Sequence, residues 1–180
     1  ACPAITMRSF AHEKSTGTYE SLMTTPVTPL QVLGSKFMSC WLFYGLLWVP
    51  LWLMMIWLGR FFNDPGYLDA GIIAGTSLGV MLVGALFLSI GCLASVLTQS
   101  QLIAAMMALT LEMALFMLSF VIYLLPDQSG WQAALFEHIS LFNHMSDFVR
   151  GIVDGRHLAF YLCATALSLF ATWRWVESHK

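Results

Sequence analysis

The sequence AGIIAGTSLGVMLVGALFLSIGCLASVL, residues 70–97, decides the fold. It carries no charged side chain and exceeds the about 20 apolar residues that a helix needs to cross the hydrocarbon core of a bilayer. Glycine recurs at every fourth residue near its start, at Gly71, Gly75 and Gly79, so these glycines line one face of the helix and let another backbone approach closely. Both packing within the chain and a seam between two subunits explain such a stripe.

Three further stretches have the length and the apolar character of membrane spans. The first is uncharged and contains a proline that predicts a kink, and the last ends in tryptophans, as aromatic belts do at membrane interfaces. Only four polar residues, 98–101, separate the span at 70–97 from the next one, so these two helices are predicted to be antiparallel neighbours. The three stretches are residues 37–58, 102–125 and 157–176.

The composition of the chain agrees with a bilayer protein. Hydrophobic residues make up 58% of the 180 residues and charged residues 10%, whereas soluble domains carry about 25% charged residues. The formal net charge is −2 with only eight Lys and Arg residues, so the chain has no basic field that would bind nucleic acid. Most of the scattered cysteines lie in apolar runs, where they act as small hydrophobic residues. We therefore expect an all-α integral membrane protein, with membrane lipid as a partner and no nucleic acid.

Four spans place both visible ends of the chain on one side of the membrane. If that side is cytoplasmic, five basic residues lie inside and three outside, which agrees with the positive-inside rule. The inner residues are Arg8, Lys14, Lys36, Arg174 and Lys180, and the outer residues are Arg60, Arg150 and Arg156.

The stretch between the third and fourth spans, residues 126–156, is amphipathic. Its apolar side chains recur three or four residues apart, at Trp131, Leu135, Ile139, Phe142, Met145, Phe148 and Ile152. It is too polar to cross the membrane. The pattern predicts a helix or a pair of helices that lies at the outer interface or re-enters the membrane from that side.

Histidines and carboxylates in or beside this stretch raise the alternative of an intramembrane enzyme or a metal protein. His144 and Asp147 would share one helical face. However, the sequence has no H-E-x-x-H motif, no cysteine pair and no G-x-S-x-G elbow, and interfacial His and Asp are usually solvated. We therefore expect no catalytic residue and no metal on this chain. The residues considered are Glu137, His138, His144, Asp147, Asp154 and His157.

The segment EKSTGTYESLMTTPVTP, residues 13–29, precedes the first span. Ser15, Thr16 and Thr18 can cap a helix. Gly17 interrupts any helix that arrives from the N-terminal side, and Pro26 ends one. The pattern predicts a short helix that lies parallel to the membrane on its cytoplasmic side.

Two segments of the chain resemble ABC-2 type transporter permeases. PAITMRSFAHEKSTGTYESLMTTPVTPLQVLGSKF, residues 3–37, resembles the segment between their second and third spans, with Met-Arg, acidic-Lys, Gly-Thr, Glu, Leu and Thr-x-Pro-Val elements in the same order. SLFNHMSDFVRGIVDGRHLAFYL, residues 140–162, resembles the segment before their last span, especially in the group associated with gliding motility and copper-site assembly of a reductase. One departure is Gly34-Ser35-Lys36, since the family usually has Gly directly before this Lys.

The resemblance implies roles for particular residues. The Gly-Thr-x-Glu segment would be a coupling helix, which docks in a groove of a separate ATP-hydrolysing subunit and relays its motion to the spans. The implied coupling residues are Glu13, Gly17, Thr18, Glu20, Leu22 and Pro26. The outer motif that carries the second match comprises His144, Asp147, Phe148, Arg150, Gly151 and Asp154.

The resemblance also implies how the chain works with other subunits. Residues 1–180 would form one membrane domain, with 1–36 as its cytoplasmic coupling segment. The chain opens on Ala-Cys-Pro without an initiator Met, as a fragment would. The resemblance implies two further spans before Pro3, so the four visible spans would be the last four of six. No G-x-x-x-x-G-K-[ST] phosphate loop occurs, so ATP and Mg are expected on a partner ABC ATPase, with no cofactor on this chain.

The implied function is that of a permease subunit, paired with a second permease subunit in a homodimer or heterodimer. It would export a substrate across a bacterial-type cytoplasmic membrane and would not itself be an enzyme. The alternative is a membrane scaffold that anchors a protein complex without transport.

Glu112 is the charged residue near the middle of a span. A carboxylate there costs about 2.5–3.5 kcal/mol on insertion scales, so we expect it to face the protein interior or a wet cavity. No hydroxyl stands three or four residues away on its own helix, so a partner would come from another helix. Glu112 would then line the subunit interface or the translocation path, or make an interhelical hydrogen bond.

Overall fold

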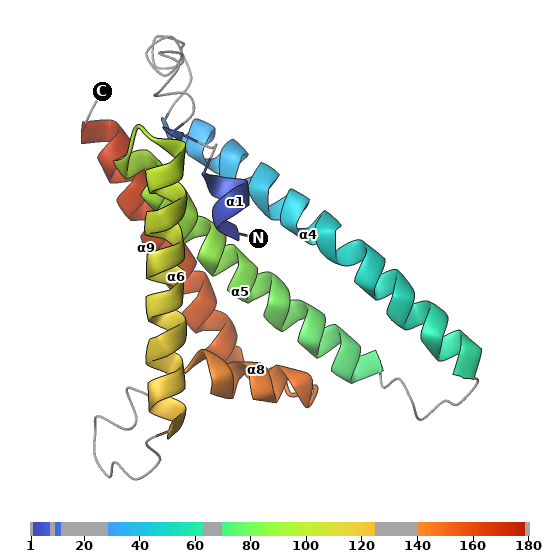
Figure 1. Cartoon of the computed structure of the whole chain (residues 1–180). Coiled ribbons are helices and arrows are strands. Elements are labelled where there is room, and N and C mark those ends of the chain that lie inside the picture. The colour runs from blue at the N-terminus through green and yellow to red at the C-terminus, as the bar shows by residue number, and fades with distance from the viewer. Residues whose placement is uncertain (1, 8–9, 12–28, 63–69, 125–139, 179–180) are drawn as a thin grey trace.

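The computed structural model describes residues 2–7, 10–11, 29–62, 70–124 and 140–178 (Figure 1). These residues form helices and contain no strand, so the expectation of an all-α fold is confirmed. The described helices are α1 (Cys2–Thr6), α4 (Pro29–Phe62), α5 (Ala70–Leu97), α6 (Gln101–Leu124), α8 (Leu141–Val149) and α9 (Gly155–Ser178).

Three of these helices are long and apolar enough to cross a membrane. They are α4, α5 and α6, over Leu30–Phe61, Gly71–Leu97 and Gln101–Phe120. Helix α9 has 24 residues, which is enough length for a span, but it includes polar and charged residues near both ends. The crossing expected at 157–176 therefore stays a prediction.

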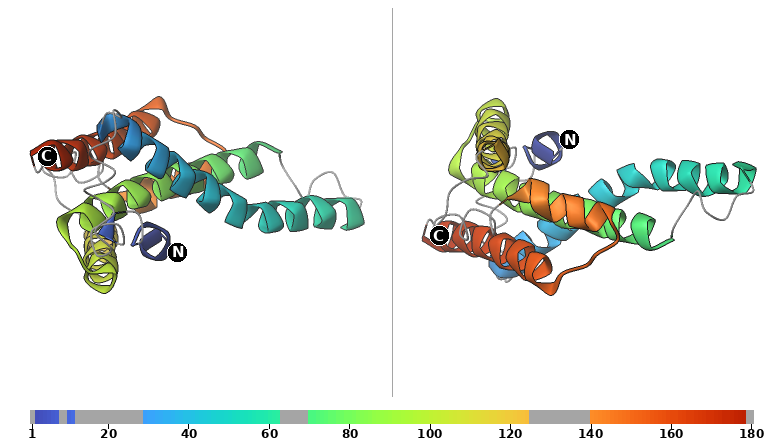
Figure 2. Two further views of the ribbon diagram at one scale, coloured as in Figure 1. Left: turned by 90° about the horizontal axis from the view of Figure 1, so that it is seen from above. Right: turned by 90° about the horizontal axis from the view of Figure 1, so that it is seen from below.

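Helix α5 is the centre of the bundle. It contacts every other described helix, and the views along the bundle in Figure 2 show its neighbours arranged around it. Within the most apolar part of each candidate span, 56% of the α5 residues are buried, against 17% for α6 and 6% for α4. A helix that is apolar on all sides and surrounded by other helices is the one on which the rest of the fold packs.

Helix α4 is inclined to the rest of the bundle and separates from it along its length (Figure 1). It continues through Pro50 for 34 residues. At 1.5 Å per residue it is about 51 Å long, so it exceeds a hydrocarbon core of about 30 Å and must tilt or project into the interface.

The two ends of the bundle differ. One end gathers the starts of α4 and α6, the ends of α5 and α9, and α1 (Figure 1). We call it the terminal end. Helix α8 lies across the opposite end, which we call the α8 end. The short turn between α5 and α6 makes these helices antiparallel neighbours, as their sequence predicts.

Candidate functional site

The part of residues 1–36 that would hold the coupling helix, residues 12–28, lies outside the described residues, and we call residues 12–28 the coupling segment from here on. This applies to all six residues that the family resemblance assigned to the ATPase contact, namely Glu13, Gly17, Thr18, Glu20, Leu22 and Pro26. The residues on both sides of the segment are described, and they define where it starts and ends on the bundle.

The chain enters the coupling segment from a fixed point on α5. The backbone N–H groups of Phe10 and Ala11 both donate to Ser95 Oγ, at 3.1 and 3.0 Å. Ser95 is fully buried near the C-terminal end of α5. One turn earlier on α5, a Cβ at Gly91 would collide with the side chain of Thr6, so the glycine is what lets α1 lie against α5.

The chain leaves the coupling segment at the same place. Leu33 in the first turns of α4 packs in one buried cluster with Phe10, Val96 of α5 and Val176 of α9. The ammonium group of Lys36 lies 4.3 Å from the centre of the Phe10 ring, within the range of a cation–π contact. We call these five residues and Ser95 the base of the coupling segment, because they join its two ends to three long helices.

At the α8 end, helix α8 is capped at both termini. Ser140 is its N-cap, and its Oγ accepts from the N–H of Asn143 at 3.4 Å. Gly151 follows the C-cap with a φ of +75° and donates to the carbonyl of Phe148, while Ile152 donates to that of Asp147, both at 3.0 Å. This is a Schellman motif, which requires a residue such as glycine at the left-handed position.

Helix α8 packs closely on the glycine stripe of α5. A Cβ at Gly75 would lie 2.6 Å from the carbonyl oxygen of Phe148, and a Cβ at Gly79 would lie 2.9 Å from the Phe148 ring. The backbone of Gly151 approaches that of Gly71. Phe148 is fully buried in this notch. The glycine spacing allowed either packing within the chain or a seam between two subunits. In this structure the glycines pack within the chain, against α8.

Two further contacts hold α8 to other helices. Its first residue, Leu141, donates its N–H to the buried Oγ of Ser119 on α6, at 3.2 Å. At its other end, Asp147 Oδ2 lies 3.1 Å from Nε2 of His157 in the first turn of α9. Helix α8 is thereby joined to α5, α6 and α9, and we call this set of contacts the α8 clamp.

The histidines of the outer motif pack inside the clamp. His144 is 1% exposed, and the centre of its ring lies 4.0 Å from the centre of the His157 ring. It also meets the rings of Phe160 and Tyr161 edge to face. The hydroxyl of Tyr161 is buried and has no hydrogen-bond partner among the described residues. Within those residues, no three His, Cys, Asp or Glu side chains are grouped so that they could hold a metal.

The remaining residues of the outer motif lie at the surface. Arg150 is exposed at the C-cap of α8, and the Asp154 carboxylate accepts the N–H of Arg156 at 3.0 Å, at the start of α9. The amphipathic pattern identified Phe148 as buried, but the buried face also contains Leu141 and His144, and Ile152 is exposed.

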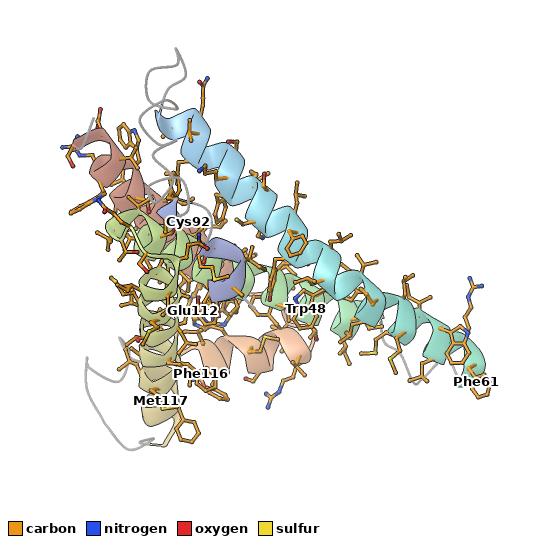
Figure 3. The ribbon with its side chains drawn as sticks, turned by 45° about the horizontal axis from the view of Figure 1, so that its top comes forward. Trp48, Phe61, Cys92, Glu112, Phe116 and Met117 are labelled. Carbon is orange, nitrogen blue, oxygen red and sulfur yellow. The ribbon has the colours of Figure 1, made fainter. Side chains whose placement is uncertain are left out.

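Glu112 lies on the side of α6 near α1, one helical turn above Phe116 (Figure 3). Its Oε1 is buried and has no hydrogen-bond partner among the described residues. The interhelical hydrogen bond offered as one role for Glu112 is thus not formed by this oxygen within the described part of the chain.

Several of these positioning residues were not identified from the sequence. Ser95 and Ser119 are single serines in apolar runs, and only their long-range contacts distinguish them from serines bonded to their own helix. Phe10 and Leu33 lie on opposite sides of a long segment. The second matched segment, residues 140–162, contains Tyr161. However, the burial of Tyr161 against His144 depends on how α8 packs on α9.

Comparison with known proteins agrees with this architecture. A family model described as ABC-2 family transporter protein matches residues 1–172, which is nearly the whole chain. No curated protein and no solved structure matches the chain. The match covers the coupling segment with its base, the spans α4, α5 and α6, the α8 clamp and most of α9. The chain therefore belongs to the ABC-2 transporter family, as a membrane subunit.

Proposed function

We propose that this permease subunit exports a substrate across a cytoplasmic membrane when a separate ABC ATPase pulls or pushes on residues 13–26. The family supports a role as a transporter subunit. The observation that carries the coupling proposal is the base of the coupling segment. Both ends of residues 12–28 are joined there to α4, α5 and α9.

The base can pass force from the segment to the spans. A load on residues 12–28 enters α5 through two hydrogen bonds to one buried serine, and enters α4 and α9 through a packed apolar cluster. Packed side chains resist deformation, so the helices respond by moving as rigid bodies. The movement reaches the α8 end along α5, which carries the glycine stripe of the α8 clamp.

We further propose that ATP and Mg act on the partner ATPase and that two permease subunits work as a pair. Among ABC-2 permeases, the outer motif favours membership of the group that is associated with gliding motility and with copper-site assembly of a reductase. With the ATPase on the cytoplasmic side, the terminal end of the bundle would face the cytoplasm. The α8 clamp would then lie at the outer surface of the membrane.

The test is a cross-link between the coupling segment and the ATPase. Cysteines replace Thr18 or Glu20 in a full-length chain whose native cysteines, including Cys2, Cys40, Cys92 and Cys163, are alanine, and the ATPase carries a photoactivatable group along its surface groove. We expect a cross-link from either position. The matched control is Val153→Cys, an exposed position at the α8 end, which should give none.

A failure of Thr18 and Glu20 to cross-link, or a cross-link from Val153 instead, would contradict the coupling proposal. The runner-up is a scaffold that anchors a complex without transport. Substrate-stimulated ATP hydrolysis by the reconstituted complex separates the two, because a scaffold leaves the ATPase indifferent to substrate.

A further inference from the structure

A cavity of about 290 Å³ lies between α4, α5, α6 and α8. Its walls are almost wholly apolar, with the rings of Tyr44, Trp48, Phe87, Phe116 and Phe142 and the thioether of Met145. The phenol of Tyr44 donates to the Val80 carbonyl at 3.5 Å, so even this polar group is bonded to the protein. The volume is just below the range of about 300–1,000 Å³ that is usual for ligand pockets.

The rings of the cavity belong to four different helices, α4, α5, α6 and α8. Tyr44 and Trp48 of α4 meet edge to face, with ring centres 6.1 Å apart. On the other side Phe116 of α6 and Phe142 of α8 lie 5.4 Å apart. Aromatic faces attract both apolar groups and cations. Such walls fit a slender hydrocarbon body, and they also favour a positive charge at its end.

One carboxyl group lies next to this cavity. Glu112 precedes the wall residue Phe116 by four positions on α6, so the two share a helical face, and Figure 3 shows Glu112 between Phe116 and α1. Cys2 of α1 packs in a cluster with Tyr44, another wall residue. The carboxyl therefore lies toward the terminal end of the cavity.

Within the described residues, no basic side chain neutralises this carboxyl. The basic residues of α4 are near its ends, where Lys36 lies over the Phe10 ring and Arg60 is in the last turn, and α5 and α6 have none. Glu112 is partly buried, and its buried Oε1 has no hydrogen-bond partner among the described residues, so contact with a bound cation would be favourable.

We propose that this cavity binds an amphiphilic organic cation, with its apolar body among the rings and its positive group at Glu112. The carboxylate gives charge complementarity, and the rings of the walls add cation–π attraction. That such a cation is the exported substrate rests on the proposed function. The binding itself requires only this chain.

The experiment measures binding to the full-length permease in lipid nanodiscs without any ATPase. Decyltrimethylammonium is the probe, decanol is its uncharged counterpart, and titration calorimetry uses empty nanodiscs as the blank. We expect saturable binding of the cation with one site per chain. Decanol should bind at least about tenfold more weakly because it lacks the charge.

Three variants locate the site. Glu112→Gln should weaken cation binding about tenfold or more and leave decanol unchanged. Val83→Phe fills the cavity from α5 and should abolish saturable binding of both. Met113→Gln is the matched control, since it places the same amide in the same turn at an exposed position, and it should bind as the unmodified chain does.

Equal binding of the cation and decanol, unchanged by Glu112→Gln, would overturn the proposal in favour of a cavity for lipid chains. Absence of saturable binding, or binding that survives Val83→Phe, would overturn it as well. The cross-linking experiment at Thr18 and Glu20 tests the proposed function separately, because its result does not depend on this ligand.

Discussion

Phe148 of α8 lies against Gly79 of α5 so closely that a methyl group on the glycine would be 2.9 Å from the aromatic ring. We predict that Gly79→Ala destabilises the chain by about 1–3 kcal/mol, as overpacking of a filled site does. The measurement is unfolding of the purified protein in mixed micelles by titration with dodecyl sulfate.

Gly34→Ala is the matched control for Gly79→Ala, since Gly34 is also helical and has nothing within 4 Å of its added Cβ. It should be neutral or slightly stabilising. In a Phe148→Ala background the cost of Gly79→Ala should largely disappear, because the colliding ring is gone. Equal costs with and without the ring would contradict the packing of α8 on the stripe.

Ser119 fixes the first turn of α8 through one hydrogen bond. Interhelical hydrogen bonds in membrane proteins contribute about 0.6 kcal/mol on average, so Ser119→Ala should cost less than Gly79→Ala. Hydrogen exchange is the sharper measurement, and the amide of Leu141 should exchange faster in the variant. Thr110→Ala, which removes a hydroxyl bonded only to its own helix, should leave that amide unchanged.

Asp147 and His157 join α8 to α9 as a partly exposed pair, with side chains 35% and 17% accessible. A double-mutant cycle of Asp147→Asn and His157→Gln should give a coupling energy of about 0.2–1 kcal/mol. The Arg174–Glu177 pair is more exposed, at 64% and 47%, so its coupling should be smaller. Additive effects for Asp147 and His157 would show that the pair does not hold the helices together.

Ser95 tests the base of the coupling segment. Ser95→Ala leaves the N–H groups of Phe10 and Ala11 without this acceptor, so we expect faster hydrogen exchange at both amides and less transport per ATP hydrolysed. Ser89→Ala is the control, because Ser89 is an equally buried serine of α5 whose hydroxyl bonds to its own helix. If Ser95→Ala left the transport per ATP hydrolysed unchanged, the base of the coupling segment would not transmit force from the ATPase to the spans.

The sequence predicts the helices well because their signals are local. Residues 70–97 were identified by uninterrupted apolar character, and α5 has those same bounds. The glycine spacing indicates a close helix contact, since spacing alone defines a helical face, and in the structure Gly75 and Gly79 lie against α8. The identity of the neighbour, Phe148, could not follow from spacing, because it depends on where a helix much later in the chain lies.

The candidate site divides in the same way. Motif resemblance led to His144 and Asp147, and the structure brings both to His157. The base of the coupling segment was missed because Phe10, Ser95 and Val176 are far apart in sequence and ordinary in type. Long-range packing of common residues leaves no local pattern to read.

The crossing of α9 is the remaining topological prediction. Helix α9 lies beside the core helix α5 and runs from the α8 end to the terminal end, so its two ends should be on opposite sides of the membrane (Figure 1). Cysteines at Val153 and Ser178, both exposed, are placed singly in a cysteine-free background and treated with a membrane-impermeant maleimide on intact cells. Val153→Cys should react and Ser178→Cys should react only after the membrane is opened, because the proposed orientation places the terminal end on the inside. Thr98→Cys, in the turn between α5 and α6, should behave as Ser178→Cys does, since that turn lies at the same end. Reaction of both α9 positions in intact cells would mean that α9 does not cross, and the chain would then have three spans with its ends on opposite sides.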